Sequence, residues 1–164
     1  MFAFAFAACG GSSSPPATLS NALQESIQRQ CQQQFDCKSS YVASMHDNRA
    51  FEDYYGGATV DACVNTVTTL ILTVNGQDYF TELDASVTAG RVTYNTDDYE
   101  TCTMALESET CDEVFFQNGA IFTPPAACDT VEVGRVTTGG ACTIDDDCAV
   151  AGDGCDPTAH TCGG

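Results

Sequence analysis

The sequence predicts a mainly α-helical fold: a disulfide-linked helical bundle followed by a small, irregular, cysteine-rich C-terminal module. Three observations lead to this prediction. Apolar residues recur at helical spacing through much of the chain before residue 138. The 164 residues include 11 cysteines, a density close to that of disulfide scaffolds. The last four cysteines lie in a segment with almost no apolar residues, which therefore needs cross-links to hold a structure.

The net charge excludes one class of partner. Asp and Glu number 23 against 5 Lys and Arg, which gives a formal charge of −18 at pH 7. Proteins that bind nucleic acids neutralise phosphates with Lys and Arg, and this chain has few of either. We therefore expect no nucleic-acid partner.

The N-terminal residues indicate export. The apolar run Met1–Ala8 is too short to span a bilayer, but it is typical of the end of a secretory signal peptide. The segment Phe6-Ala-Ala-Cys9 resembles a bacterial lipobox, which implies that Cys9 carries a lipid and becomes the first mature residue. We interpret residues 1–9 as a signal-peptide remnant with a lipobox-like segment, and expect the natural start to lie upstream. The alternative is an apolar terminus with an ordinary thiol at Cys9.

Residues 10–18 have the Gly/Ser/Pro composition of a flexible tether. Nine such residues reach roughly 15–20 Å, enough to hold a domain just clear of a membrane surface. In the lipoproteins that this start resembles, the residue after the modified cysteine influences sorting, and Gly10 favours the outer membrane.

Helical periodicity is regular in three segments and weaker elsewhere. We expect a helix within Thr18–Ser40 that is capped by Thr18 or Ser20 and ends between Asp36 and Ser40. A less regular helix is expected over Tyr41–Tyr55, and another after an N-cap at Thr59 that ends at Gly76. Further helices are expected over 78–87, after Asn95 or Thr96, and from the capping box that begins at Thr110. We expect residues 91–95 to be extended. The alternating valines at 131–136 predict a short hairpin or extended segment. Residues 19–138 would form the helical domain and residues 139–164 the cysteine-rich module.

With Cys9 assigned to lipid, an even set of ten cysteines remains, which indicates disulfides in an exported chain. Zinc is disfavoured because there is no C-x-x-C motif and His46 and His160 stand alone. The ten are Cys31, Cys37, Cys63, Cys102, Cys111, Cys128, Cys142, Cys148, Cys155 and Cys162.

The pairing stays open at the sequence level. The six cysteines of the helical domain allow 15 pairings, of which we prefer Cys37 with Cys63, Cys102 with Cys111, and Cys31 with Cys128. The four C-terminal cysteines allow three pairings, of which we prefer the interlocked one, Cys142 with Cys155 and Cys148 with Cys162.

Five carboxylates in the C-terminal segment are weak candidates for calcium, which prefers oxygen ligands. Their spacing does not match an EF-hand loop, and a solvated acidic surface is the stronger interpretation. They are Asp145, Asp146, Asp147, Asp153 and Asp156.

Motifs for common catalytic chemistry are missing from the sequence. There is no G-x-S-x-G element, no C-x-x-C redox pair, and neither histidine lies near a recognisable nucleophile. Chemistry that needs only two carboxylates stays open, because acidic residues are plentiful.

The order of these signals resembles the cysteine-rich lipoproteins of myxobacteria and related bacteria. The resemblance lies in the lipobox-like start, the helix opening T-V-D-A-C at Thr59, the phrase G-R-V-T-Y-N at Gly90, C-D-T-V-E-V-G-R-V at Cys128, and G-A-C at Gly140. The last four cysteines are similar in spacing to Dickkopf N-terminal and EGF-like modules. The resemblance implies an exported, lipid-anchored protein of unknown function, and it transfers no catalytic residue.

We therefore expect a non-enzymatic cell-envelope lipoprotein that acts as a surface interaction or binding module, with a protein or polysaccharide partner and no required cofactor. It would lie on the periplasmic or outer face of the outer membrane, or outside the cell if released. The alternatives are a secreted enzyme or enzyme accessory that uses carboxylate chemistry, and a purely structural envelope protein.

Overall fold

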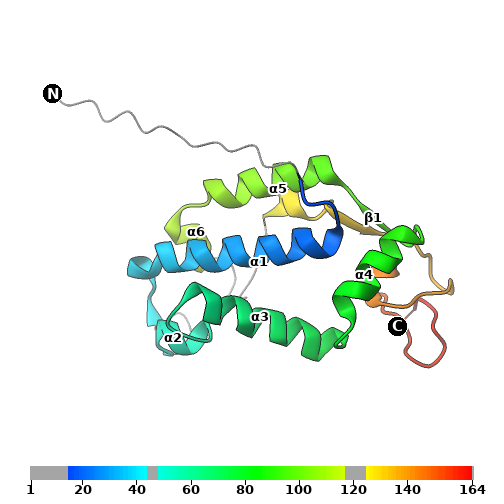
Figure 1. Ribbon diagram of the computed structural model, residues 1–164, viewed down its shortest axis with the longest axis horizontal. Coiled ribbons are helices and arrows are strands. Elements are labelled where there is room, and N and C mark those ends of the chain that lie inside the picture. The colour runs from blue at the N-terminus through cyan, green and yellow to red at the C-terminus, as the bar shows by residue number, and fades with distance from the viewer. Residues whose placement is uncertain (1–14, 44–47, 117–124, 164) are drawn as a thin grey trace.

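The computed structural model describes residues 15–43, 48–116 and 125–163 and confirms the mainly α-helical prediction. Three helices form the body: α1 (Leu19–Asp36) lies between α3 (Val60–Asn75) and α5 (Thr96–Ser108) (Figure 1). The helix α4 (Tyr79–Thr88) crosses one end of this layer, and the short α6 (Cys111–Phe116) follows α5. Single 3-10 turns occur at η1 (Lys38–Ser40), η3 (Ala126–Cys128) and η4 (Asp145–Asp147).

The helix ends follow the capping chemistry that the sequence predicts. The Thr18 side chain accepts a hydrogen bond from the Asn21 amide at the start of α1, and Asn95 caps α5 through the Asp98 amide. At the end of α3, Gly76 takes a φ of 103°, a value that side chains disfavour.

The helix predicted over Tyr41–Tyr55 is wrong for most of its length. Only α2 (Phe51–Tyr54) is an α-helix among the described residues of this stretch, and residues 44–47 lie outside them. Asn48 has a left-handed φ of 57°, which interrupts a helix. Aromatic rings from both sides of this break pack together instead, with the Tyr41 and Phe51 ring centroids 5.3 Å apart.

The valine-rich segment is extended, but it does not form a hairpin around Gly134. Its strand β2 (Glu132–Gly134) pairs antiparallel with β1 (Val92–Tyr94), far earlier in the chain. A Cβ atom at Gly134 would lie 2.4 Å from the Cys148 carbonyl oxygen. This glycine therefore serves the close approach of the C-terminal segment and not a turn.

All ten cysteines of residues 15–163 form disulfides. The interlocked C-terminal pairing is confirmed, with Cys142 joined to Cys155 and Cys148 to Cys162. All three preferred pairs of the helical domain are wrong: Cys37 with Cys63, Cys102 with Cys111, and Cys31 with Cys128. The structure joins Cys31 to Cys63, Cys37 to Cys111 and Cys102 to Cys128.

The reason for these pairings is the way the helices pack. Cys31 and Cys63 are fully buried where α1 faces α3. Cys37 directly follows the last residue of α1. The helix α1 contacts α6, and Cys111 is the first residue of α6. Cys102 meets Cys128 because η3 packs on α5. Helix periodicity shows which face of a helix is apolar but not which helix covers it.

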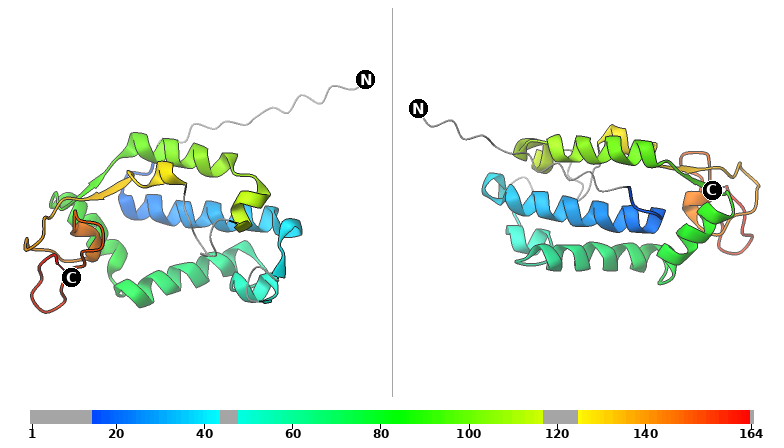
Figure 2. Two further views of the ribbon diagram at one scale, coloured as in Figure 1. Left: turned by 180° about the vertical axis from the view of Figure 1, so that it is seen from behind. Right: turned by 45° about the horizontal axis from the view of Figure 1, so that its top comes forward.

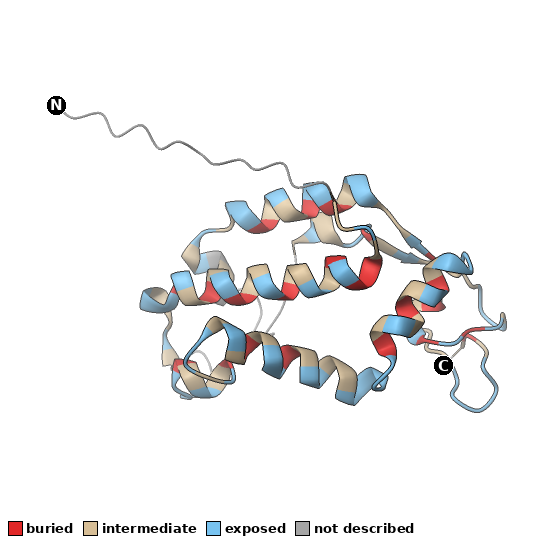
Figure 3. Ribbon diagram, viewed as in Figure 1, coloured by how far each residue is buried: buried red, intermediate tan, exposed pale blue. Residues whose placement is uncertain are grey.

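The C-terminal segment is docked on the helical body. Its Ile144 is buried in a cluster with Leu19, Tyr79, Leu83 and Val92. Figure 3 shows buried residues where this segment meets α4, while its outer loop is exposed. Disulfides are therefore not the only interactions that hold the segment in place.

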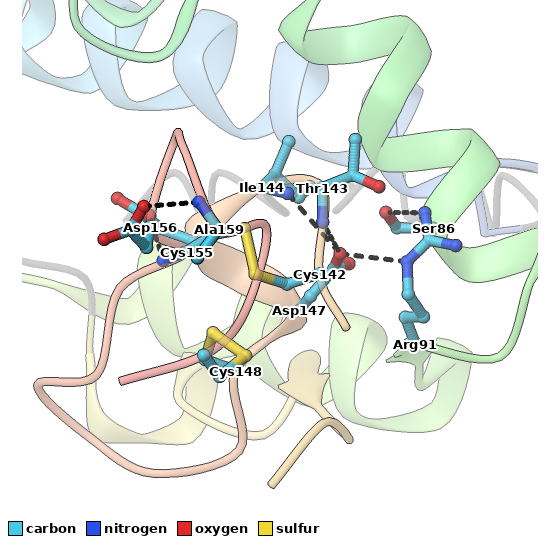
Figure 4. Close-up of a disulfide and its surroundings, with 12 residues drawn as sticks. Ser86, Arg91, Cys142, Thr143, Ile144, Asp147, Cys148, Cys155, Asp156 and Ala159 are labelled. Atoms are coloured by element: carbon cyan, nitrogen blue, oxygen red, sulfur yellow. Dashed lines mark hydrogen bonds and ion pairs between the residues drawn. A yellow bond between two sulfur atoms is a disulfide. The ribbon is translucent and has the colours of Figure 1, made fainter. Parts of the chain in front are cut away.

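Asp147 is the polar centre of this docking (Figure 4). Its side chain has 0 % exposure, and Oδ2 lies 2.9 Å from Nε of Arg91 and 2.7 Å from the Thr143 amide nitrogen. Burial alone would raise the pKa of Asp147, but hydrogen bonds from Ser86, Thr143, Arg91 and Ile144 outweigh burial and lower it. The carboxylate is thus held charged in the interior by its donors.

We expect the substitution Asp147→Asn to destabilise the protein by about 2–4 kcal/mol, because it leaves Arg91 half-buried without its counter-charge. The wild-type contribution is present above the ordinary carboxyl pKa of 3.8 and is lost as the pH falls through the lower folded pKa. Urea unfolding at pH 7 measures the change. Asp129→Asn, at an exposed position, is the control, and equal stability of the two variants would contradict the assignment.

Candidate functional site

Three of the five calcium candidates satisfy local hydrogen bonds of the C-terminal segment. Oδ1 of Asp145 accepts from the Cys155 amide at 2.7 Å, and Oδ1 of Asp156 accepts from the backbone amides of Thr158 and Ala159. A threonine hydroxyl donates to Asp153. These side chains organise turns, as short acidic side chains commonly do.

The five aspartates do not converge on one point. In the described part of the chain, the metal-type grouping within 4.8 Å consists of sulfur atoms of Cys142, Cys148 and Cys162, all of which are in disulfides. His160 is exposed on a tight turn. Cys9 and His46 lie outside the described residues.

An apolar groove of about 390 Å³ runs along α1. We call the α1 residues of its lining the floor, those of α3 one wall, and those of α5, η3 and the start of β2 the opposite wall. Figure 2 shows α1 between α3 and α5. The volume lies within the range of small-molecule sites, about 300–1,000 Å³. Its lining includes Leu19, Ala22, Leu23, Ser26, Ile27, Gln30, Val67, Leu70, Ile71, Tyr99, Cys102, Cys128, Val131 and Glu132.

A second hollow of about 490 Å³ lies between α1 and the end of α5 and has mainly polar lining residues. Its charged groups already pair with their neighbours: Arg29 bridges Glu25 and Glu107 with N–O distances of 2.6 Å. The apolar groove is therefore the better candidate for a ligand, because a ligand there would not compete with existing ion pairs.

Glu132 gives the apolar groove an acidic end. It is the first residue of β2, opposite Tyr94, and its Oε1 is buried without a hydrogen-bond partner. Its carboxyl group lies near that of Asp146 of η4, whose charge acts on it, and the Tyr79 hydroxyl donates to Oδ2 of Asp146 at 2.9 Å. Two carboxyl groups from distant parts of the sequence are thus neighbours beside Tyr79 of α4.

Burial and mutual repulsion hold a proton on this pair. Burial, followed by the charge of Asp146, raises the pKa of Glu132 to about 8. Burial also raises the pKa of Asp146, although the hydrogen bond from Tyr79 opposes this shift. Near neutral pH Glu132 therefore retains its proton.

Glu132 is the functional candidate that the sequence does not reveal. The alternation of Val131 and Val133 places Glu132 on the polar face of an exposed hairpin. In the structure Val133 is 38 % exposed, whereas Glu132 is half-buried. Only the pairing with β1 and the docking of η4 turn this carboxylate inward, and no local sequence signal encodes either contact.

We expect the stability of the protein to fall as the pH rises from 4.5, the ordinary carboxyl pKa, to about 8. In this window the folded state holds a proton that the unfolded chain has lost, so raising the pH favours unfolding. In Glu132→Gln, the decrease in the free energy of unfolding over this pH range should be smaller by on the order of 2 kcal/mol. Urea unfolding at pH 5, 6.5 and 8 measures it.

The control is Glu100→Gln, which removes the same charge from an exposed position of α5. It corrects for the general effect of net negative charge on stability. An identical pH slope in both variants would show that the Glu132–Asp146 pair holds no extra proton.

No described helix is long and apolar enough to cross a membrane. Comparisons with protein-family models, with curated proteins and with solved structures find no match to this chain.

Proposed function

We propose that this chain is an exported, lipid-anchored, non-enzymatic binding protein of the cell envelope that takes an apolar ligand in the groove along α1. The observation that carries the proposal is the groove itself: a concave, mainly apolar site on a body cross-linked by disulfides. The expected protein or polysaccharide partner would then be secondary to this ligand.

The framework of the groove supports a preformed site. The floor and one wall are joined by the buried disulfide Cys31–Cys63, and Cys102–Cys128 belongs to the opposite wall. Binding to a rigid site loses less conformational entropy than binding to one that must be ordered first. This framework favours a ligand-binding role over a purely structural one.

Export is supported by the five disulfides, because such bonds persist in oxidising compartments. The lipobox-like segment before Cys9 and the tether at 10–18 support attachment to a membrane. Outer-membrane placement rests on Gly10 and on the resemblance to lipoproteins.

A second candidate function is acid–base catalysis, which the Glu132–Asp146 contact favours. Two carboxyl groups that share a proton can act as an acid–base pair. Turnover of ester, glycoside or peptide substrates at pH 5–8 that disappears in Glu132→Gln would favour this candidate.

We expect the neutral dye Nile red to bind the folded protein saturably with an increase in fluorescence. Leu70→Asp should weaken this binding at least about fivefold, because Leu70 lines the groove and a charge there opposes an apolar ligand. Val74→Asp is the matched control: Val74 is 73 % exposed, lies one turn further along α3 and is not among the lining residues. Equal effects of both variants, or no saturable binding, would contradict the binding role.

The anchor is tested by mass spectrometry of protein extracted from membranes of the native host without reduction. We expect an N-terminal peptide that begins at Cys9 and carries acyl chains, because the lipobox-like segment directs both cleavage and acylation. A chain that retains Met1 with an unmodified Cys9 would overturn the assignment to the envelope.

A further inference from the structure

We propose that the ligand of the groove is an amphiphilic amine, whose apolar body lies along α1 and whose cationic head pairs with Glu132 and Asp146. This inference rests on the proposed binding function and adds the chemical class of the ligand. It joins two observations: an apolar groove whose lining includes Glu132, and the half-buried carboxyl group of Asp146 beside Glu132.

The lining of the groove separates an apolar part from an acidic end. Most described lining residues are aliphatic or aromatic, and Glu132 is the charged side chain among them. Ser26 and Gln30 add neutral polar groups on the α1 side. A ligand that matches this distribution has one polar end and an apolar remainder.

The unsatisfied oxygen of Glu132 identifies the polar end as a hydrogen-bond donor. Oε1 is buried and accepts no hydrogen bond within the described protein, which is costly for a carboxyl group. A carboxylate head would place a third acidic group against Glu132 and Asp146 and would be repelled. A donor head, in contrast, supplies the missing bond.

A cation fits this end better than a neutral hydroxyl. Glu132 holds a proton because burial and the charge of the neighbouring Asp146 both disfavour its ionisation. A primary ammonium can replace that proton: the carboxyl pair releases one proton to the solvent, and the ammonium forms charge-assisted hydrogen bonds to the resulting carboxylates. The net charge of −18 further attracts a cation and not an anion.

The neighbours of the pair leave its negative charge available. Tyr79 of α4 donates one neutral hydrogen bond to Asp146, and Asp145 and Asp147 add negative charge from η4. The nearby cation, Arg91, is already bound to Asp147 at 2.9 Å. Because proton release accompanies binding, amine affinity should increase as the pH rises from 6 to 8.

The test is displacement of Nile red by three ligands with the same ten-carbon chain: decylamine, decanol and decanoate. At pH 7.5 we expect decylamine to compete at least about tenfold better than decanol, with decanoate the weakest, in line with the strength of buried charge-assisted hydrogen bonds. The decylamine advantage should grow between pH 6 and pH 8, while decanol should show no such trend.

Glu132→Gln should reduce decylamine binding to the level of decanol and leave decanol unchanged within about twofold. Asp146→Asn is the second variant and should also lower the affinity for decylamine. Glu100→Gln controls for general attraction of cations to an acidic protein, since Glu100 is exposed. Far-ultraviolet circular dichroism verifies that each variant is folded.

The outcomes separate the two proposals. If decylamine and decanol compete equally with the wild-type protein, or if Glu100→Gln weakens decylamine as much as Glu132→Gln, the amine assignment is wrong and the apolar groove remains. If none of the three displaces Nile red and the dye itself shows no saturable binding, the binding function fails as well.

Discussion

The contact between α1 and α3 through the disulfide Cys31–Cys63 is the constraint on which the remaining structure depends. Both cysteines have 0 % exposure, and they belong to a cluster that includes Ile27, Phe51 and Val67. This cross-link fixes the floor of the groove against one wall. The opposite wall is then held on α1 by buried side chains around Tyr99 and Val131 and is closed by Cys102–Cys128. The groove and the hydrophobic core are therefore held together by the same packed side chains and disulfides.

Much of the helical architecture follows from local sequence signals. The stripe along α1, the Thr59 cap of α3 and the Asn95 cap of α5 each depend on neighbours within one or two turns, and the structure contains all three. The segment before α2 could not be predicted in this way, because Tyr41, Phe51 and Tyr54 satisfy a helical pattern and an aromatic cluster equally well. The disulfide pairs of the helical domain depend on which helices face one another, and periodicity carries no such information.

The candidate site could be predicted only in part. The apolar stripe that lines the groove, such as Leu23 and Ile27, is visible in the sequence as a core face. Its acidic end is not, because Glu132 and Asp146 lie in segments whose local composition indicates solvent-exposed loops. Long-range contacts convert Glu132 from a surface charge into a half-buried acid with a raised pKa. The five aspartates after Gly140 show the same effect: identical residues become turn acceptors, a buried ion-pair partner or one half of a carboxyl pair.

The docking of η4 on α4 and β2 has a consequence for the biogenesis of the protein. Asp146, which lies next to Glu132, comes from the last part of the chain, whereas the groove is lined by residues from Leu19 to Glu132. Because a chain is synthesised from its N-terminus, all described lining residues of the groove, Glu132 included, precede Asp146. The acidic neighbour that adds to the effect of burial on the pKa of Glu132 is therefore supplied last, after every described residue that lines the groove.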